Sequence, residues 1–250
     1  MRAVVLALLL GWGALAAAAS LQLSYQPATE PALQRIAERV QHEQWLERYQ
    51  PSVADLHLPQ PLWLVFAQCD EANAYYSRDE QRAQITLCYE DVQDSEARYA
   101  QWLAEGDVEA EEIPALIQQW FDYSYLHELG HALIDLLELP ALGREEDVAD
   151  QLAAYFMFAD EDGELALQSV LDGYSEEDEL SDEALADPHA LNAQRAFNML
   201  CWAYGADAER YAWAGEELPE ARREGCADEY AILADSFEQL LAPHWSETAP

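Results

Sequence analysis

The sequence contains no lysine, so its 12 basic residues are all arginines, against 49 aspartates and glutamates. The formal net charge is therefore −37 at pH 7. A surface this negative repels phosphate groups, which argues against nucleic acid and anionic membranes as partners. Cationic peptides, metal ions or a high-salt medium suit it better. The charge reflects either a partner or a salt-adapted habitat, and both interpretations stay open.

Apolar runs long enough to cross a membrane are missing beyond the N-terminus. There, Met1 and Arg2 precede an apolar segment, 3–15, and small residues follow up to Ala19 and Ser20. A positive charge, a short apolar stretch and a small-x-small cleavage site are the parts of a secretory signal peptide. We therefore predict a signal peptide at 1–19, with a retained anchor as the alternative. The mature protein is expected to be periplasmic or extracellular and free of the membrane.

Cysteine is scarce, and no Cys-x-x-Cys pair occurs. This absence argues against a zinc–thiolate cluster, and an oxidising compartment favours disulfides instead. Four cysteines allow three pairings, among which sequence alone does not choose. Proximity along the chain favours the pairs Cys69–Cys88 and Cys201–Cys226.

Internal repeats and long linkers are also absent, while 51% of the residues are apolar. This composition excludes collagen-like and wholly disordered chains and is ample for one core. We therefore expect a single domain spanning residues 20–250.

Hydrophobic patterning predicts the secondary structure within this domain. Two short apolar runs, 63–67 and 85–89, are typical of strands. Helices are expected at 30–49, 114–138, 145–158, 192–204 and 219–241. The acidic segment 96–112 is expected to be helical or exposed, and the acidic segment 160–187 to be a mobile surface loop. The fold class is therefore α+β, mainly helical with a small mixed sheet.

The strongest functional signal is His127-Glu128-Leu129-Gly130-His131, inside the longest expected helix. Residues four apart stand on the same helical face, so both imidazoles can bind one ion. Glu128 is rotated by about 100° from His127, which places it beside the ion, where a general base is needed. The pattern would arise by chance about 0.02 times in such a chain, so two solvated histidines are the weaker explanation.

A hydrolytic zinc site needs a third protein ligand and an open fourth position. Glu146 and Asp150 lie four residues apart on the next expected helix and therefore share a face. One of them can bind the metal, while the other accepts a hydrogen bond from the far nitrogen of a ligand histidine.

His127-Glu128-x-x-His131 followed by Glu146-x-x-x-Asp150 resembles the gluzincin branch of zinc metallopeptidases. The resemblance implies a zincin-like fold in which His127, His131 and Glu146 bind Zn²⁺. It also implies that Asp150 supports a ligand histidine.

The segment 127–147 looks more narrowly like a bacterial family of exported metallopeptidases without an assigned substrate. The likeness spans roughly residues 60–242, with supporting marks at Asn73-Ala-Tyr-Tyr, Leu87-Cys88-Tyr89, Arg195, Cys201-Trp-x-Tyr204-Gly205, Cys226 and Glu229-Tyr230. The spacing from His131 to Glu146 is shorter than in the best-known gluzincins. Glu145 or Asp147 therefore stays open as the third ligand.

The resemblance implies hydrolysis of a peptide or protein substrate. Glu128 takes a proton from the attacking water and delivers it to the leaving amine. The oxyanion needs a donor besides zinc, for which His189 is the first candidate and Tyr204 and Arg195 are the next. The structural alternatives are that His189 caps a helix, that Tyr204 is a buried aromatic residue and that Arg195 is ion-paired.

Two further alternatives remain. The strand 85–89 is expected to form the sheet edge that lines the cleft, unless it is an interior strand. The alternative function is a catalytically inactive zincin-like module that binds metal or protein. The intact Glu128 favours the enzyme, because a structural site gains nothing from an acid beside its metal.

Overall fold

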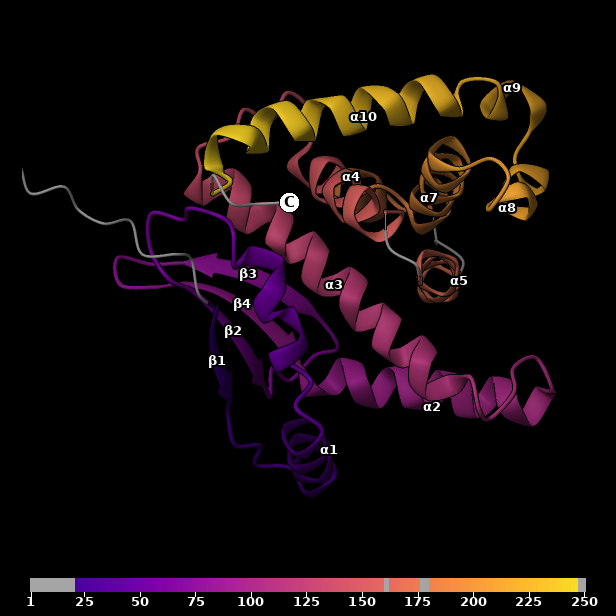
Figure 1. Cartoon of the computed structure of the whole chain (residues 1–250). Helices are drawn as coiled ribbons and strands as arrows, with labels where there is room; N and C mark the ends of the chain where they lie inside the picture. The colour runs from indigo at the N-terminus through magenta and orange to yellow at the C-terminus, as the bar shows by residue number, and fades with distance from the viewer. Residues whose placement is uncertain (1–20, 160–161, 176–179, 247–250) are drawn as a thin grey trace, which may run out of the picture.

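The structure is a computed structural model that describes residues 21–159, 162–175 and 180–246. The expected signal peptide at 1–19 lies outside these residues. Within them, a small mixed sheet and a larger set of helices confirm the predicted α+β class (Figure 1). No helix in the described part combines the length and apolarity needed to cross a bilayer.

The sheet has the strand order β1-β2-β4-β3. Its strands are β1 (Leu21–Tyr25), β2 (Leu62–Ala67), β3 (Ala74–Arg78) and β4 (Ala83–Cys88). β1, β2 and β4 run parallel, and β3 is antiparallel to β4, with Tyr76 opposite Ile85. The two expected strands are therefore confirmed as β2 and β4. The prediction that the second of them forms the sheet edge is wrong, because β4 lies between β2 and β3 and β3 takes the edge.

The helices account for most of the described chain. They are α1 (Pro31–His42), α2 (Tyr89–Glu105), α3 (Ile113–Leu136), α4 (Glu145–Met157), α5 (Gly163–Gly173), α6 (Asp182–Ala186), α7 (Asn192–Ala206), α8 (Ala212–Glu217), α9 (Glu220–Arg223) and α10 (Cys226–Leu241), with short 3₁₀ turns at Glu47–Val53 and Ala242–His244. α3 runs between the sheet and the helices α4 and α5, while α10 packs across α4 and α7 (Figure 1). α3 is therefore buried on most sides, in keeping with apolar residues nearly all round it.

The close packing of α3 against α4 depends on Gly130. A Cβ atom at this position would lie 2.9 Å from the Cα of Ala149, which is backbone and cannot move aside cheaply. The missing side chain thus lets the two helices approach closely enough to share a site.

We expect Gly130→Ala to lower the free energy of unfolding by about 1–3 kcal/mol, because overpacking outweighs the gain in helix propensity. Urea denaturation measures this change. Gly143→Ala is the matched control, since a Cβ there meets nothing within 4 Å. Equal stability of the two variants would contradict the packing role of Gly130.

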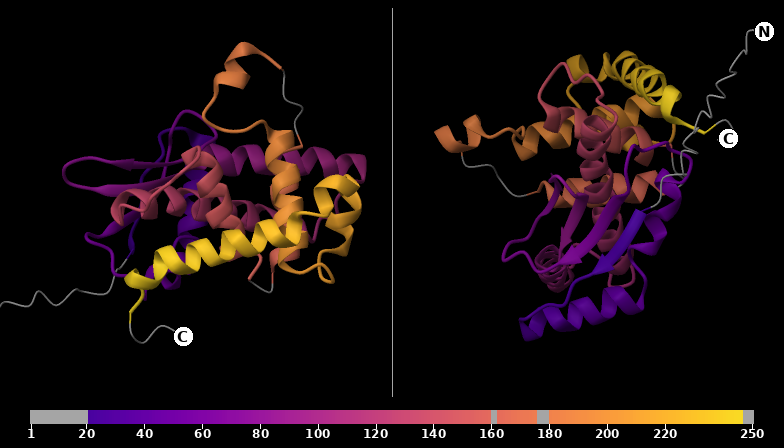
Figure 2. Two further views of the ribbon diagram at one scale, coloured as in Figure 1. Left: turned by 90° about the horizontal axis from the view of Figure 1, so that it is seen from above. Right: turned by 90° about the vertical axis from the view of Figure 1, so that its left-hand side faces the viewer.

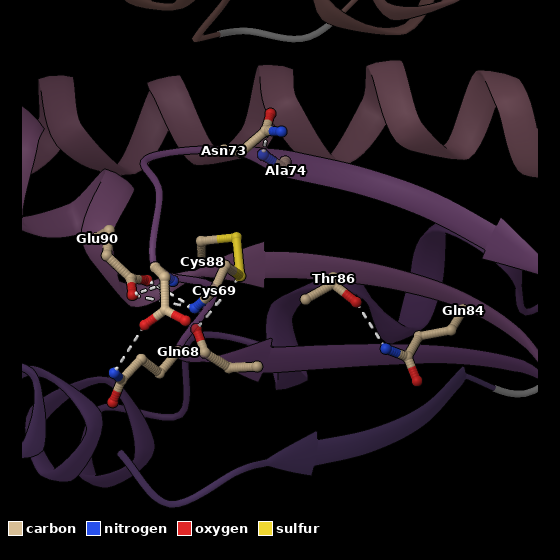
Figure 3. Close-up of a disulfide and its surroundings, with 10 residues drawn as sticks. Gln68, Cys69, Asn73, Ala74, Gln84, Thr86, Cys88 and Glu90 are labelled. Carbon is tan, nitrogen blue, oxygen red and sulfur yellow. Dashed lines mark hydrogen bonds between the residues drawn. A yellow bond between two sulfur atoms is a disulfide. The ribbon is translucent and has the colours of Figure 1, made fainter. Parts of the chain in front are cut away.

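Two disulfides confirm the favoured cysteine pairing, and no described cysteine is free. Cys69–Cys88 joins the loop after β2 to the end of β4 (Figure 3). The carboxylate of Glu90 accepts hydrogen bonds from the backbone N–H groups of Cys69 and Asp70 at 2.8–3.0 Å. Cys201–Cys226 joins α7 to the start of α10. The two disulfides are typical of proteins in an oxidising compartment.

Three element boundaries differ from the prediction. The first helix ends at His42 rather than Tyr49, because Gln44 adopts a positive φ of 57° and Trp45 N–H bonds back to the Val40 carbonyl. The C-terminal helix is divided into α9 and α10. Residues 163–173, expected to be loop, form α5, whose buried Leu167 and Val170 pack towards α3. The abundance of acidic residues hid this apolar face, and parts of 160–187 lie outside the described residues.

Candidate metal centre

Two imidazoles from α3 and one carboxylate from α4 meet at a single point. The Nε2 atoms of His127 and His131 are 3.3 Å apart, and Oε2 of Glu146 lies 3.2 and 3.1 Å from them. A tetrahedral zinc ion with ligand bonds of about 2.0–2.1 Å holds its ligand atoms about 3.3 Å apart. The three side chains therefore fit three corners of such a site.

His189 brings a third imidazole from the segment between α6 and α7. Its Nε2 lies 2.9 Å from Oε2 of Glu146, and its ring stacks against that of His127 at a centroid distance of 6.1 Å. The ligand atoms of His127, Glu146 and His189 all lie within 4.8 Å of one another. The His189 side chain is 43% exposed, against 7% for His127, so it lies on the open side of the cluster. The structure therefore brings His189 into the cluster, and its role there stays a prediction.

Each imidazole has a carboxylate at its far nitrogen. The Nδ1 atoms pair at 2.8–3.0 Å, His127 with Asp150, His131 with Glu145 and His189 with Asp187. Such a partner keeps the proton on Nδ1 and leaves the lone pair of Nε2 free to bind an ion. All three rings thus have the orientation that metal ligation requires.

The same contacts bear on the third ligand. Glu145 pairs with Nδ1 of His131, on the side of the ring away from the cluster, and Asp147 pairs with Arg144. Only Glu146, among these three acids, presents an oxygen to both Nε2 atoms. The geometry therefore favours Glu146 as the third ligand, while Glu145 orients the His131 ring through its far nitrogen.

Behind His127 lies a buried polar network centred on Asp150. Arg195 makes a bidentate ion pair with this carboxylate, Nε to Oδ2 at 2.8 Å and Nη2 to Oδ1 at 2.7 Å. Tyr123 donates its hydroxyl to Asp150 and receives a bond from Arg195. Tyr174 completes the network through the Tyr123 hydroxyl and stacks under the guanidinium. Arg195 is thus engaged in holding Asp150.

Asp150→Asn should weaken zinc binding by about 10–100-fold, because the partner that fixes the His127 ring loses its charge. It should also lower the free energy of unfolding by about 3–5 kcal/mol, since the buried Arg195 loses its counter-ion. Zinc titration and urea denaturation measure the two effects. Glu229→Gln is the control, because it breaks a bidentate pair with Arg222 outside the site. Zinc affinity equal to that of the control would contradict the role of Asp150.

Hydrogen bonds within the cluster shift the pKa values of its imidazoles and of its carboxylate in opposite directions. Burial lowers the pKa of His127, but hydrogen bonds to Asp150 and Glu146 outweigh this and raise it to about 9. Burial raises the pKa of Glu146, yet bonds from three imidazoles bring it far below its usual range. In the absence of metal the imidazoles therefore hold protons, which a bound ion has to displace.

Glu128 faces the cleft beside this cluster. Burial raises the pKa of its carboxyl, while nearby His127 and His131 and the backbone N–H of Tyr76 oppose the rise. Tyr76 belongs to the edge strand β3, and its hydroxyl donates to Asp135 of α3 at 2.7 Å. The cleft has a volume of about 570 Å³ and is walled by β3, α3 and the segment that carries His189. A raised carboxyl pKa next to an ion site suits proton transfer.

Tyr204, the second candidate for a catalytic donor, is not brought into this cleft. Its ring packs against Gly215 of α8, and it lines a separate surface pocket together with Glu220 and Arg223. Helix α7 points this residue away from α3. The geometry therefore gives no support to a role for Tyr204 in the reaction.

Sequence reasoning missed several partners in the site. Asp187 stands two residues before His189. Its carboxylate accepts a hydrogen bond from the backbone N–H of His189 and pairs with Nδ1 of the His189 ring. The Asp-x-His spacing could have indicated this local pattern. Tyr123 lies one helical turn before His127, on the same face. Tyr174 carried no such signal, because only the packing of the helices brings it close.

Comparison with known proteins yields one match. The model of a family described as "Putative metallopeptidase" matches residues 25–241, which is most of the chain. No significant match was found among the curated proteins or among the solved structures.

Proposed function

The chain belongs to the Putative metallopeptidase family, and from this premise we propose that it is a zinc-dependent peptidase with Glu128 as its general base. The observation that carries the proposal is the convergence of His127, His131 and Glu146 at distances of 3.1–3.3 Å. Family membership implies a metal ion. The N, N, O donor set and its tetrahedral spacing favour zinc.

The residues have distinct roles in this proposal. When bound, Zn²⁺ supplies a Lewis acid that polarises a water molecule and the scissile carbonyl. Glu128 lies beside the ion site, accepts the proton of the attacking water and passes it to the leaving amine. Its raised pKa favours both transfers, since the carboxyl must take up and release a proton in one cycle.

His189 stabilises the negative charge that develops on the carbonyl oxygen. The hydrogen bond with Glu146 raises the pKa of His189, and Asp187 at the far nitrogen adds to this rise. A higher pKa favours the imidazolium form, which donates from both ring nitrogens. Arg195 positions Asp150 and has no direct part in the reaction.

The proposal also covers where the protein acts. Two disulfides suit the periplasm or the extracellular space, where peptide or protein substrates are met outside the cytoplasm. A signal peptide at 1–19 and one mature domain at 20–250 complete this proposal. Mass spectrometry of the secreted protein tests the cleavage site directly.

Metal removal tests the function. Purified mature protein should hold one zinc ion per chain and hydrolyse peptides, and a strong chelator should remove both the ion and the activity. Restoring zinc should restore hydrolysis and raise the melting temperature, because the ion binds only the folded site. Metal analysis, a peptide-mixture assay and thermal melts give the three readouts. Zinc binding without hydrolysis of any peptide would favour the inactive binding module instead.

A further inference from the structure

Asp91 is a buried carboxylate at the far end of the cleft that the proposed reaction does not use. It lies in the first turn of α2, is only 7% exposed and lines the same cleft as His127 and Glu128. Among the described residues, its hydrogen-bond donor is the indole Nε1 of Trp120, at 3.1 and 3.0 Å from the two carboxylate oxygens. One neutral donor leaves most of the acceptor capacity of a carboxylate unused.

No cation is bonded to this carboxylate in the described part of the chain. The guanidinium of Arg98 is near enough to lower the pKa of Asp91, but its Nη2 atom bonds to Asp94 at 3.3 Å. Burial dominates and raises the pKa of Asp91 to about 6, so the group is mostly ionised at pH 7.5. A buried negative charge without a bonded cation is costly, and a cationic ligand would relieve that cost.

The position of Asp91 suits a basic side chain that extends along the cleft from the ion site. Its partner Trp120 lies on the same face of α3 as His127, two turns earlier, which is about 10 Å along the helix. A substrate residue beside the scissile bond can span much of this distance with the stem of a lysine or arginine. Arg195, which lines the cleft, is neutralised by Asp150 and does not compete for Asp91.

We propose that Asp91 determines specificity by binding the ammonium or guanidinium group of a substrate lysine or arginine close to the scissile bond. The substrates are accordingly peptides with a basic residue at one fixed position. This inference rests on the proposed peptidase function and deepens it. It also differs from attraction by the bulk charge of −37, which would favour basic residues anywhere in the peptide.

Blocked peptides with lysine, arginine, methionine or glutamate at single positions around the cleaved bond provide the test, with zinc-loaded mature protein. Lysine or arginine at one position should raise kcat/KM at least about 10-fold over methionine, mainly through KM, as a charge-assisted hydrogen bond would. Asp91→Asn keeps an acceptor for Trp120 and should reduce this lysine-to-methionine ratio to near 1. Glu105→Gln, which removes an exposed charge at the end of α2 where Glu105 bonds, within the described chain, only to Gln101, should leave the ratio unchanged.

Binding separates failure of this inference from failure of the proposed function. Zinc-loaded Glu128→Gln should bind the lysine peptide about 10-fold more tightly than the methionine peptide by calorimetry, and adding Asp91→Asn should remove the difference. Absence of hydrolysis with this difference intact would overturn the peptidase and keep the site. Hydrolysis without a position-specific basic preference would overturn the role of Asp91. Equal losses in Asp91→Asn and Glu105→Gln would overturn it as well.

Discussion

Glu128→Gln is expected to retain zinc and to lower kcat/KM for peptide hydrolysis by at least about 100-fold, the usual contribution of a general base. The amide has nearly the shape of the carboxylate but cannot take a proton from water. The ligand atoms of His127, His131 and Glu146 do not involve Glu128, so the ion should stay bound. Metal analysis together with steady-state kinetics on one peptide measures both parts.

Asp147→Asn is the matched control for this loss. Asp147 follows the proposed ligand Glu146 but pairs with Arg144 at the surface, so its replacement removes a nearby charge without touching the proposed reacting groups. Hydrolysis should stay within about twofold of wild type, as is usual for surface substitutions. Unchanged activity in Glu128→Gln would refute the general base, and equal losses in both variants would show that only the local charge matters.

Glu146→Gln is expected to abolish stable metal binding. Loss of an outer partner of a ligand costs about 10–100-fold in metal affinity, so loss of a charged ligand should cost more than 100-fold. Competition with a chromophoric chelator measures the affinity. Asp147→Asn should bind zinc normally, and the reverse result would assign the third ligand to Asp147.

His189→Gln completes this comparison, because His189 contacts the same oxygen of Glu146 as His127 and His131, the two proposed ligands. As a donor to the oxyanion, His189 can be replaced without loss of zinc, and the loss appears in kcat at about 100-fold or more. A variant that loses its zinc would instead make His189 a fourth ligand and remove the donor role. Glu146→Gln and His189→Gln thus distinguish a residue that binds the ion from one that stabilises the oxyanion.

The convergence of the proposed metal ligands could be predicted because they are close in the chain. His127 and His131 are one helical turn apart, so the helix alone aligns their rings. Glu146 and Asp150 repeat this spacing on the next helix, and the short turn between the helices returns the chain to the same point. The two disulfides likewise join cysteines that are near neighbours in sequence.

Contacts between distant segments could not be predicted in the same way. The edge position of β3 depends on β2 and β4 pairing in parallel, which places β4 in the interior. α5 was taken for a loop because acidic residues flank it on both sides in 160–187, although α5 itself holds only two, Glu164 and Asp172. The views in Figure 2 show the segment around α6 projecting from the body, and the chain that follows it returns to place His189 at the ion site.

The sequence by itself determined which side chains form the candidate centre, because local helical geometry is enough to align two imidazoles, a neighbouring glutamate and a following carboxylate. Tertiary structure decided which groups surround that centre. Asp91 and Arg195 reach the cleft walls, and Tyr204 turns away, only through the packing of helices far apart in the chain. Helical periodicity repeats within one turn and can be read from neighbouring residues. Packing depends on the shapes of all the buried side chains together, which no single segment encodes.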